Sequence, residues 1–348
     1  MKSRVYPGTR KPLVRNQHKQ YVPPGPRRLE KLAAVFLDAL TPDEFLRLRS
    51  CVDKNCTWRI GTLCSGSESP LLAWHGLAAA VAAKTDSCIE VAHSFSCELR
   101  EQTRLWILAL FPDALVFTNA LNLNNERATT HQGDMQKVPD DWRCAIAGFP
   151  CTAVSGQNPH AFTDANRSCI ASGSLATGSI FSAIVGMAAK HLKRMERSIR
   201  DGNIVFILLE NVVNLVVKSK RALMSNLDEV ISQLEAAGWV VVVWHLSPKD
   251  FGVPASRPRL WIAVVPRLAM ELVGYSDEDQ FRSEQAPLDA YLLPVDSPLI
   301  VEGLNESVVK REFEGGRAED AVLSAGGIIT PSVMVSSSPQ CKTASPRA

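Results

Sequence analysis

The sequence predicts an α/β fold with a doubly wound, mostly parallel sheet and helices on both of its faces. The first observation is the order of patterns, because short apolar runs alternate with longer amphipathic stretches from residue 58 to 266. Alternation of this kind is typical of βαβ units, whose strands lie parallel in one sheet. The second is the composition: 46% hydrophobic and 21% charged residues suit a chain that buries a sizeable core. Such a fold is Rossmann-like, and 58–266 is its predicted domain.

The predicted strands are the apolar runs, and most of the amphipathic stretches between them are predicted helices. Strands are expected at 58–64, 90–97, 115–118, 144–147, 204–209, 239–245 and 260–265. Helices are expected at 99–111, 179–199 and 222–237. Residues 30–57 are expected to form a helical extension, in which Thr41 is suited to cap a helix and Pro42 to occupy its first position.

Both ends of the chain differ from this domain in composition. Residues 1–29 contain three Lys, five Arg and five Pro and no acid, which predicts an extended, disordered arm. Such an arm suits contact with phosphates or a nuclear address as well as a simple solvated terminus. Residues 267–323 are mixed and polar and form an abbreviated C-terminal region. Residues 324–348 are rich in Ser, Pro, Gly and Ala, and are expected to be a disordered tail.

Charge and cysteine spacing narrow the class of protein. The formal net charge of +2 gives no global basic field that would declare a nucleic-acid partner. Among the nine cysteines, Cys51 and Cys56 lie closest together but lack the further Cys or His of a zinc site, so no metal is expected. No secretory signal opens the chain, and no apolar run approaches the length of a membrane span. An intracellular location, nuclear in a eukaryote, and no membrane partner are therefore expected.

Three features near predicted strand ends favour an adenosine-type cofactor. In an open parallel sheet, ligands bind beyond the carboxyl ends of the strands. The first strand ends in the small-residue turn 64–69, in which Cys64, Ser65 and Gly66 allow a ligand close approach to the backbone. Glu98 follows the second strand and suits ribose hydroxyls, and Asp134 precedes the fourth strand and suits an adenine amine. A glycine turn is usually only a turn and an acid after a strand is usually solvated, so the inference depends on the combination.

A second group of residues predicts the chemistry. A lone cysteine is most often a small buried hydrophobe. Cys151 differs, because it follows Pro150 at a strand end and leads into a loop of small and polar residues. Glu210 comes directly after an apolar strand, a position that suits an acid or base in a site. Arg257 and Arg259 precede the last strand and suit a carboxylate or a phosphate.

Together these residues resemble the cytosine-5 DNA methyltransferase family. Pro150-Cys151 looks like the Pro-Cys loop of that family, and 210–212 reproduces its Glu-Asn-Val motif. Residues 255–259 are similar to its Gln-x-Arg-x-Arg segment, and 178–181 to the opening of a family helix. The order and spacing of the motifs agree over 58–266.

The resemblance implies S-adenosylmethionine as cofactor and DNA as substrate. Residues implied to bind the cofactor are Cys64, Ser65, Gly66, Glu98, Asp134, Pro150 and Ile180. The Cys151 thiolate would add to C6 of a cytosine flipped out of its helix, and Glu210 would contact N3 and the exocyclic amine. Arg257 and Arg259 would help to hold the base.

The chain also departs from the family pattern. The family turn Asp-Leu-Phe-x-Gly-x-Gly-Gly reads here Thr-Leu-Cys-Ser-Gly-Ser-Glu-Ser at 62–69. Residues 303–309 are faintly similar to the closing helix of the family. The segment between Pro266 and that helix, where the family has its target-recognition region, is short for a region that reads base edges. Slight sequence specificity, or a protein partner that supplies target recognition, is expected. Two other functions stay open: the same chemistry on RNA, as in the tRNA-methylating branch, and a non-catalytic protein that binds nucleic acid or a partner methyltransferase.

Overall fold

A seven-stranded mixed sheet organises the computed structural model. In chain order its strands are β1 (Thr57–Leu63), β2 (Glu90–Cys97), β3 (Val116–Phe117), β6 (Cys144–Gly148), β7 (Phe206–Val212), β8 (Trp239–Leu246) and β9 (Arg259–Pro266). In space they follow the order β3-β2-β1-β6-β7-β9-β8. The first five in this order pair in parallel, whereas β9 pairs antiparallel with both β7 and β8. The prediction of a doubly wound, mostly parallel sheet is confirmed.

The structure describes most of the chain between residues 34 and 269. The described residues are 34, 37–38, 40–54, 57–85, 89–201, 203, 205–219, 223–250 and 255–269. The predicted arm at 1–29, nearly all of the region 267–323 and the tail 324–348 therefore lie outside the described residues. The same is true of the likeness at 303–309 and of 251–254, which precedes the two arginines.

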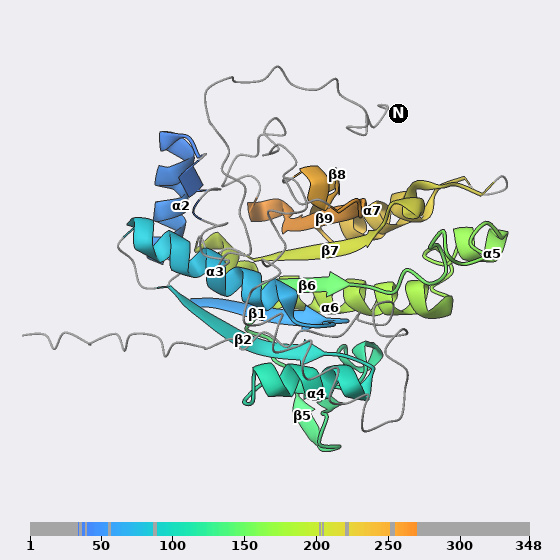
Figure 1. The fold of residues 1–348 in the computed structure, drawn as a ribbon, viewed down its shortest axis with the longest axis horizontal. Helices are drawn as coiled ribbons and strands as arrows, with labels where there is room; N and C mark the ends of the chain where they lie inside the picture. Colours follow the sequence, from blue (N-terminus) through green and yellow to red (C-terminus); the bar gives the residue numbers. More distant parts are fainter. Residues whose placement is uncertain are drawn as a thin grey trace, which may run out of the picture. The chain divides into compact units, whose positions relative to one another are not determined.

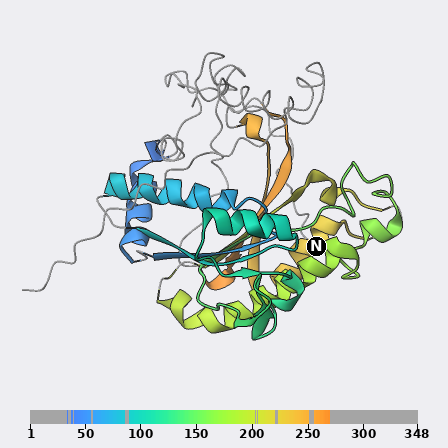
Figure 2. The same ribbon diagram turned by 60° about the horizontal axis from the view of Figure 1, so that its bottom comes forward.

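Helices cover both faces of the sheet. They are α2 (Pro42–Lys54), α3 (Ser69–Thr85), α4 (Glu101–Leu110), α5 (Asp164–Arg167), α6 (Leu175–Arg200) and α7 (Asn226–Ala236). Figure 1 labels these elements, and in Figure 2 the blue and teal helices α3 and α4 lie above the sheet while the yellow-green α6 lies below it. This arrangement follows from the connections, since α3 and α4 join strands on one side of β1 and α6 and α7 follow strands on the other.

Alternate residues of β6 and β7 supply two hydrophobic layers. On the face of α3, one cluster is made by Ile60, Leu71, Cys144 and Ile146, with Phe206 and Leu208 packed against it. The opposite face meets α6 and α7 in a larger cluster that includes Ala145, Ala147, Ile184, Met187, Ile207, Leu209, Leu227 and Val230. Burial on both faces explains why these strands read as continuous apolar runs.

A glycine in β1 makes room for one of these core side chains. A Cβ atom built on Gly61 would lie 2.4 Å from the Cε1 atom of the buried Phe95 ring. The pairing of β1 with β2 shifts register between Ile60 and Gly61, so that Gly61 lies opposite Phe95. A side chain at position 61 would force the two strands apart.

The predicted start of α2 is confirmed by its hydrogen bonds. The Thr41 Oγ1 atom accepts from the Glu44 N–H at 3.3 Å, and the Glu44 carboxylate accepts from the Thr41 N–H at 2.7 Å. This reciprocal arrangement is a capping box, and Pro42 occupies the first helical position as expected.

Several short elements have no apolar run that would have predicted them. They are the hairpin β4 (Arg127–Thr129) and β5 (Met135–Lys137), and the 3-10 turns η1 (Ala120–Asn122), η2 (Val213–Val216) and η3 (Pro248–Asp250). The predicted strand at 204–209 was also placed too early: β7 continues through Val212, so Glu210 lies within the strand and not after it. The reason is the neighbouring strand β9, which pairs Val212 with Arg259 and carries the ladder past the apolar residues. Arg259 is accordingly the first residue of β9.

Helix α6 corrects the expectation that no segment is long and apolar enough to span a membrane. By length and composition its 26 residues pass that test. Its buried side chains, among them Phe181, Ile184 and Met187, belong to the larger core cluster beneath the sheet. Burial in the core accounts for its apolar composition.

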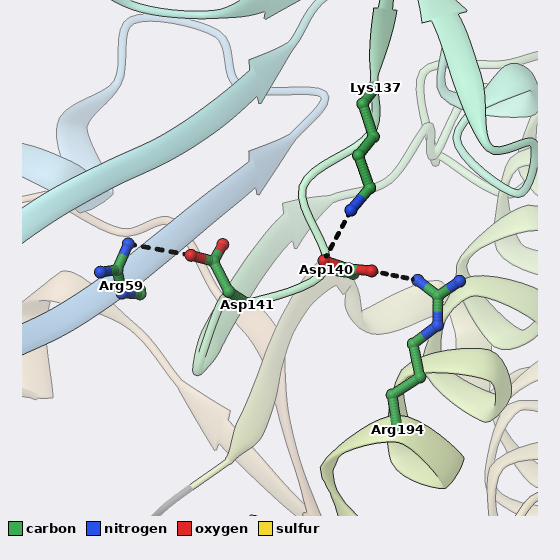
Figure 3. Close-up of polar contacts among 5 residues, drawn as sticks. All are labelled: Arg59, Lys137, Asp140, Asp141 and Arg194. Carbon is green, nitrogen blue, oxygen red and sulfur yellow. Dashed lines mark hydrogen bonds and ion pairs between the residues drawn. The ribbon is translucent and has the colours of Figure 1, made fainter.

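Ion pairs at the surface connect the segment before β6 to its neighbours (Figure 3). The Asp141 carboxylate lies 2.9 Å from Nη1 of Arg59 on β1, and Asp140 lies 2.7 Å from Nη1 of Arg194 on α6 and 3.6 Å from Nζ of Lys137. Exposed pairs of this kind each contribute about 0–1 kcal/mol. They orient this segment more than they stabilise the fold.

A buried aromatic stack lies close to these pairs. The rings of Trp142 and His191 are nearly parallel, with centroids 3.5 Å apart, and both residues are buried. Burial lowers the pKa of His191 to about 4. The folded protein therefore holds this imidazole neutral at pH values where an unfolded chain would bind a proton.

We expect acid to destabilise the fold through His191. Its ordinary pKa is 6.5 and its folded pKa is lower, so stability is complete above about pH 6.5 and falls as the pH drops toward 4. Between pH 7.5 and pH 5 this loss is about 2 kcal/mol. In urea unfolding, His191→Phe, which keeps the ring stack, should show a shallower decline than the wild type. His93, with a pKa also lowered to about 4, leaves part of the decline in place. Identical pH profiles for the two proteins would contradict this assignment.

Candidate active site

The loop that carries Cys151 begins where β6 ends. Phe149 is buried, whereas Pro150 and Cys151 are half-buried at the edge of the sheet. The backbone N–H groups of Val154 and Ser155 both donate to the Cys151 carbonyl, at 3.0 and 2.8 Å. Cys151 therefore opens a tight turn at the carboxyl end of β6.

Side chains from neighbouring segments hold this turn in place. The Ala153 N–H donates to Thr177 Oγ1 on α6 at 3.3 Å, and Asn166 Nδ2 on α5 donates to the Ala153 carbonyl at 2.8 Å. Asn158 Nδ2 donates to the Thr152 carbonyl at 2.8 Å. Polar groups of the loop are thereby satisfied by the fold, and Cys151 is presented on an ordered backbone.

The other four cysteines whose side chains the structure describes have thiols of raised pKa. These others are Cys64, Cys97, Cys144 and Cys169, and burial is the largest cause of a raised pKa in each of them. For Cys64 burial and the nearby Glu98 charge raise the pKa to about 12. A thiol reacts as its thiolate, so a raised pKa lowers the reactivity of these four thiols at neutral pH.

Glu210 is brought beside this loop by the pairing of β6 with β7. Gly148 and Glu210 are partners in the ladder, and a Cβ atom built on Gly148 would lie 3.4 Å from Glu210 Oε2. The next residue, the buried Asn211, donates through Nδ2 to the Phe149 carbonyl at 3.0 Å. Asn211 thus ties the Glu-Asn-Val strand to the backbone that leads into Cys151.

Arg259 completes the group from the other side of β7. Its Nε atom lies 2.7 Å from Glu210 Oε1, and the two side chains are only 21% and 28% exposed. Arg257 is exposed, and its backbone N–H donates to Ser247 Oγ at 3.2 Å. Of the two predicted arginines, the structure brings Arg259 together with Glu210 and leaves Arg257 outside this ion pair.

The predicted cofactor turn lies beyond β1. Gly66 has φ +56°, and the space around its Cβ position is open to at least 4 Å. Its N–H donates to Glu98 Oε2 at 3.1 Å, which joins the turn to the end of β2. The Ser65 N–H donates to the Cys97 carbonyl, and Ser65 Oγ accepts from the Cys97 N–H, both at 3.2 Å. The turn is therefore docked on β2, with open space above its glycine.

The other predicted cofactor residues are more widely spread. Asp134 is exposed beside the β4–β5 hairpin, and hydrogen bonds from Thr130 and then Gln136 lower the pKa of its carboxyl group. Ile180 is half-buried on α6 and packs on the core. Glu98 thus offers a carboxylate just after β2, and Asp134 offers one just before β5. Ile180 contributes packing.

Sequence reasoning missed several residues that shape this edge of the sheet. Leu99 directly follows Glu98 and is 74% exposed, so it offers an apolar surface beside the turn. Glu68 is fully buried beneath the turn. The roles of Asn211 and Thr177 depend on contacts with segments distant in sequence. Leu99 could have been predicted, because it is an apolar residue that directly follows an acid at a strand end. No feature of the neighbouring sequence indicates the roles of Glu68, Asn211 and Thr177.

The fold and the site define a class before any relative is considered. The chain is a Rossmann-like α/β protein with a glycine turn and an acid beyond β1 and β2, and with a cysteine and a paired carboxylate beyond β6 and β7. Over residues 186–298 it matches the family model of the C-5 cytosine-specific DNA methylases. That segment contains Glu210 and both arginines, and Cys151 lies ahead of it.

Known relatives agree with the family model. The chain is 27% identical over 248 residues to DNA (cytosine-5-)-methyltransferase DMT5 of Cryptococcus neoformans var. grubii, covering 70% of this chain and 9% of that protein. It is 30% identical over 179 residues to the type II methyltransferase M.BanI of Aneurinibacillus aneurinilyticus, covering 49% of this chain and 35% of the relative. A solved structure of a Spodoptera frugiperda DNMT2 mutant is also similar, at 16% identity and a TM-score of 0.37 over 68% of this chain and 55% of that one.

The chain is thus similar to the C-5 cytosine-specific DNA methylases over residues 186–298, and to the two curated methyltransferases over longer segments. It spans only a minor part of the two curated relatives, 9% and 35% of their lengths.

A close approach behind the cysteine loop gives a direct test of this packing. A Cβ atom on Gly178 of α6 would lie 1.9 Å from the Cys169 carbonyl oxygen, so Gly178→Ala must displace backbone. We expect a loss of about 2 kcal/mol or more in the free energy of unfolding. Ala176→Ser, on the exposed side of the same turn, should cost less than about 0.5 kcal/mol. Equal stability of the two variants in urea unfolding would contradict the described packing.

Proposed function

We propose that this protein transfers a methyl group from S-adenosylmethionine to C5 of cytosine in DNA, through a covalent adduct with Cys151. The observation that carries the proposal is the meeting of three groups at one edge of the sheet. They are the half-buried Cys151 on its ordered turn, the Glu210 carboxylate beside that turn and Arg259 paired with Glu210 at 2.7 Å. The similarity to the C-5 cytosine-specific DNA methylases supports the class of reaction.

Cys151 acts as the nucleophile. Its thiolate Sγ forms a bond to C6 of the base, and the electrons of the C5–C6 double bond move toward C5. C5 thereby becomes nucleophilic. When the C5 proton is later lost to a base, the C6–Sγ bond breaks, its electrons restore the double bond and the thiolate is regenerated.

Glu210 stabilises the charge that this addition creates. Its carboxyl group would contact the exocyclic amine and N3 of the ring, where negative charge accumulates when Sγ attacks. Arg259 holds the Glu210 side chain in place, because a guanidinium fixes the orientation of a carboxylate more closely than a point charge does. The target base must leave the helix to reach these groups, at a cost of a few kcal/mol.

The residues beyond β1 and β2 fit an adenosine cofactor. The open space above Gly66 admits a ligand to the backbone, and a carboxylate accepts more than the bonds that Glu98 receives from the Gly66 and Arg100 N–H groups. Glu98 would accept from ribose hydroxyls, Leu99 would contact the adenine ring and Asp134 would accept from its amine. S-adenosylmethionine, when bound, supplies an electrophilic methyl group.

DNA is the proposed polymer because the curated relatives carry DNA methylation in their names or family description. RNA stays the alternative substrate of the same chemistry. A non-catalytic binding role is disfavoured, since a scaffold has no need of a Cys151, Glu210 and Arg259 group. We also propose that a protein partner supplies target recognition.

We expect a trapped adduct on DNA that contains 5-fluorocytosine. Fluorine at C5 cannot leave as a proton does, so the bond between Cys151 Sγ and C6 persists after methyl transfer. The full chain and S-adenosylmethionine should be incubated with a DNA duplex and, in a separate reaction, with an RNA duplex of matched sequence. The products of both reactions are then resolved on a denaturing gel. The adduct should form on DNA and be absent with Cys151→Ser.

Cys169→Ala serves as the matched control, because it removes a buried cysteine from the segment next to the same loop. It should retain the adduct. A product on RNA alone would replace DNA as the substrate. No adduct on either polymer, with cofactor binding demonstrated by calorimetry, would overturn the enzymatic assignment.

A further inference from the structure

A buried acid lies beneath the cofactor turn. Glu68 has no exposed surface and a φ of +56°, in the left-handed region where glycine is the usual residue. A glutamate is costly here for two reasons, the backbone conformation and the removal of its carboxyl group from water. Its position therefore requires compensating contacts.

Those contacts come from hydroxyl groups on the two adjacent strands. Thr62 Oγ1 at the end of β1 donates to Glu68 Oε1 at 2.6 Å, and Ser96 Oγ on β2 donates to the same oxygen. The Ser96 hydroxyl has a single proton, so His93 Nε2, 2.8 Å away, is the donor in its own bond with Ser96. Thr62 Oγ1 also lies 2.7 Å from the Ser65 hydroxyl. The acid thus bridges β1 and β2 from below the turn.

The backbone of the turn is tied to this acid as well. The Glu68 N–H donates to the Ser65 carbonyl at 3.1 Å. Ser65 in turn exchanges two hydrogen bonds with Cys97, and the Gly66 N–H is held by Glu98. Ser65 is therefore bonded both to Glu68 and to the end of β2, and Gly66 is bonded to the acid that directly follows that strand.

The surroundings of the carboxyl group favour its neutral form. Among the described residues, the buried Oε2 atom has no hydrogen-bond partner. Burial is the largest cause that raises the pKa of Glu68, and the charge of Glu98 acts in the same direction. The hydroxyl bonds from Ser96, Thr62 and Ser65 oppose this shift without reversing it. An ionised carboxylate would leave charge on an oxygen without a donor.

We propose that Glu68 is a positioning residue that latches the turn 64–69 onto β1 and β2 through its buried carboxyl group and so sets the affinity for the cofactor. The identity of that cofactor rests on the proposed function, whereas the latch on the turn does not. The family pattern has a glycine at this place in the turn and an acid where Thr62 stands. In this chain the acid reaches the same junction from the turn itself.

Two substitutions at position 68 distinguish the contribution of the carboxyl group from those of the backbone conformation and of the ionised state. Glu68→Gly keeps the left-handed conformation and removes the side chain, whereas Glu68→Gln keeps a carbonyl oxygen for the Thr62 and Ser96 hydroxyls and excludes ionisation. Ser67→Ala changes an exposed side chain in the same turn and serves as the control. Thermal unfolding by circular dichroism verifies that each variant is folded.

The first measurement needs no cofactor. Alkylation of Cys64 by iodoacetamide, followed by mass spectrometry, reports whether the turn opens, because Cys64 is the first residue of the turn and burial keeps its thiol unreactive. Glu68→Gly should be labelled at least about tenfold faster than the wild type, while Glu68→Gln and Ser67→Ala should stay within about threefold of it.

The second measurement is the Kd for S-adenosylhomocysteine by calorimetry. It should rise about tenfold or more in Glu68→Gly and by less than about threefold in Glu68→Gln. A Cys64 labelling rate and a Kd in Glu68→Gly that both equal those of the wild type would overturn the proposal that Glu68 latches the turn. Impairment of Glu68→Gln as large as that of Glu68→Gly would contradict the assignment of the latch to the bonds that Glu68 Oε1 accepts from Thr62 and Ser96. If the wild type binds no S-adenosylhomocysteine, the proposed function fails, and the Cys64 rates alone decide on the latch.

Discussion

The register of β7 between β6 and β9 is the constraint on which the site depends. On one side it pairs Gly148 with Glu210, and on the other it pairs Val212 with Arg259. A parallel and an antiparallel neighbour thus bring a loop that leaves β6 and a residue that begins β9 to the same end of β7. Since a shift of one residue would turn Glu210 to the opposite face, the buried layers that lock the register also locate the carboxylate. The Asn211 bond to Phe149 fixes the backbone between these groups.

Burial determines which polar groups at this edge are available for chemistry. Desolvation raises the pKa of four cysteines and makes them poorer nucleophiles, whereas the proposed nucleophile Cys151 lies half-buried on its ordered loop. The same desolvation acts on Glu68 beneath the cofactor turn, where it favours a neutral acid surrounded by hydroxyls. Glu210 differs because Arg259 accompanies it and both side chains keep some contact with water. The two carboxyl groups thus have different surroundings, one buried among hydroxyls and the other paired with an arginine.

Most of the fold could be predicted from the sequence, because strands buried on both faces are apolar runs that stand out between amphipathic helices. The strand at 90–97 was predicted to the residue, and the start of α2 followed from Thr41 and Pro42. What could not be predicted depends on pairing between distant segments. The extension of β7 through Glu210 requires β9, the role of Asn211 requires Phe149, and the choice of Arg259 over Arg257 requires the register of two strands. Glu68 was missed for a similar reason, since one of its hydroxyl partners, Ser96, lies 28 residues away on β2.

A double-mutant cycle on Glu210 and Arg259 tests most directly whether the two residues that the strand register brings together act jointly in methylation. Single-turnover methylation rates would be measured for Glu210→Gln, Arg259→Leu and the double variant. A parallel cycle would combine Glu210→Gln with Arg257→Leu. An ion pair that orients the reacting carboxylate predicts a coupling energy of about 1–3 kcal/mol for Glu210 with Arg259 and less than about 0.5 kcal/mol for Glu210 with Arg257. Additive effects in the first cycle, or equal coupling in both, would contradict the account.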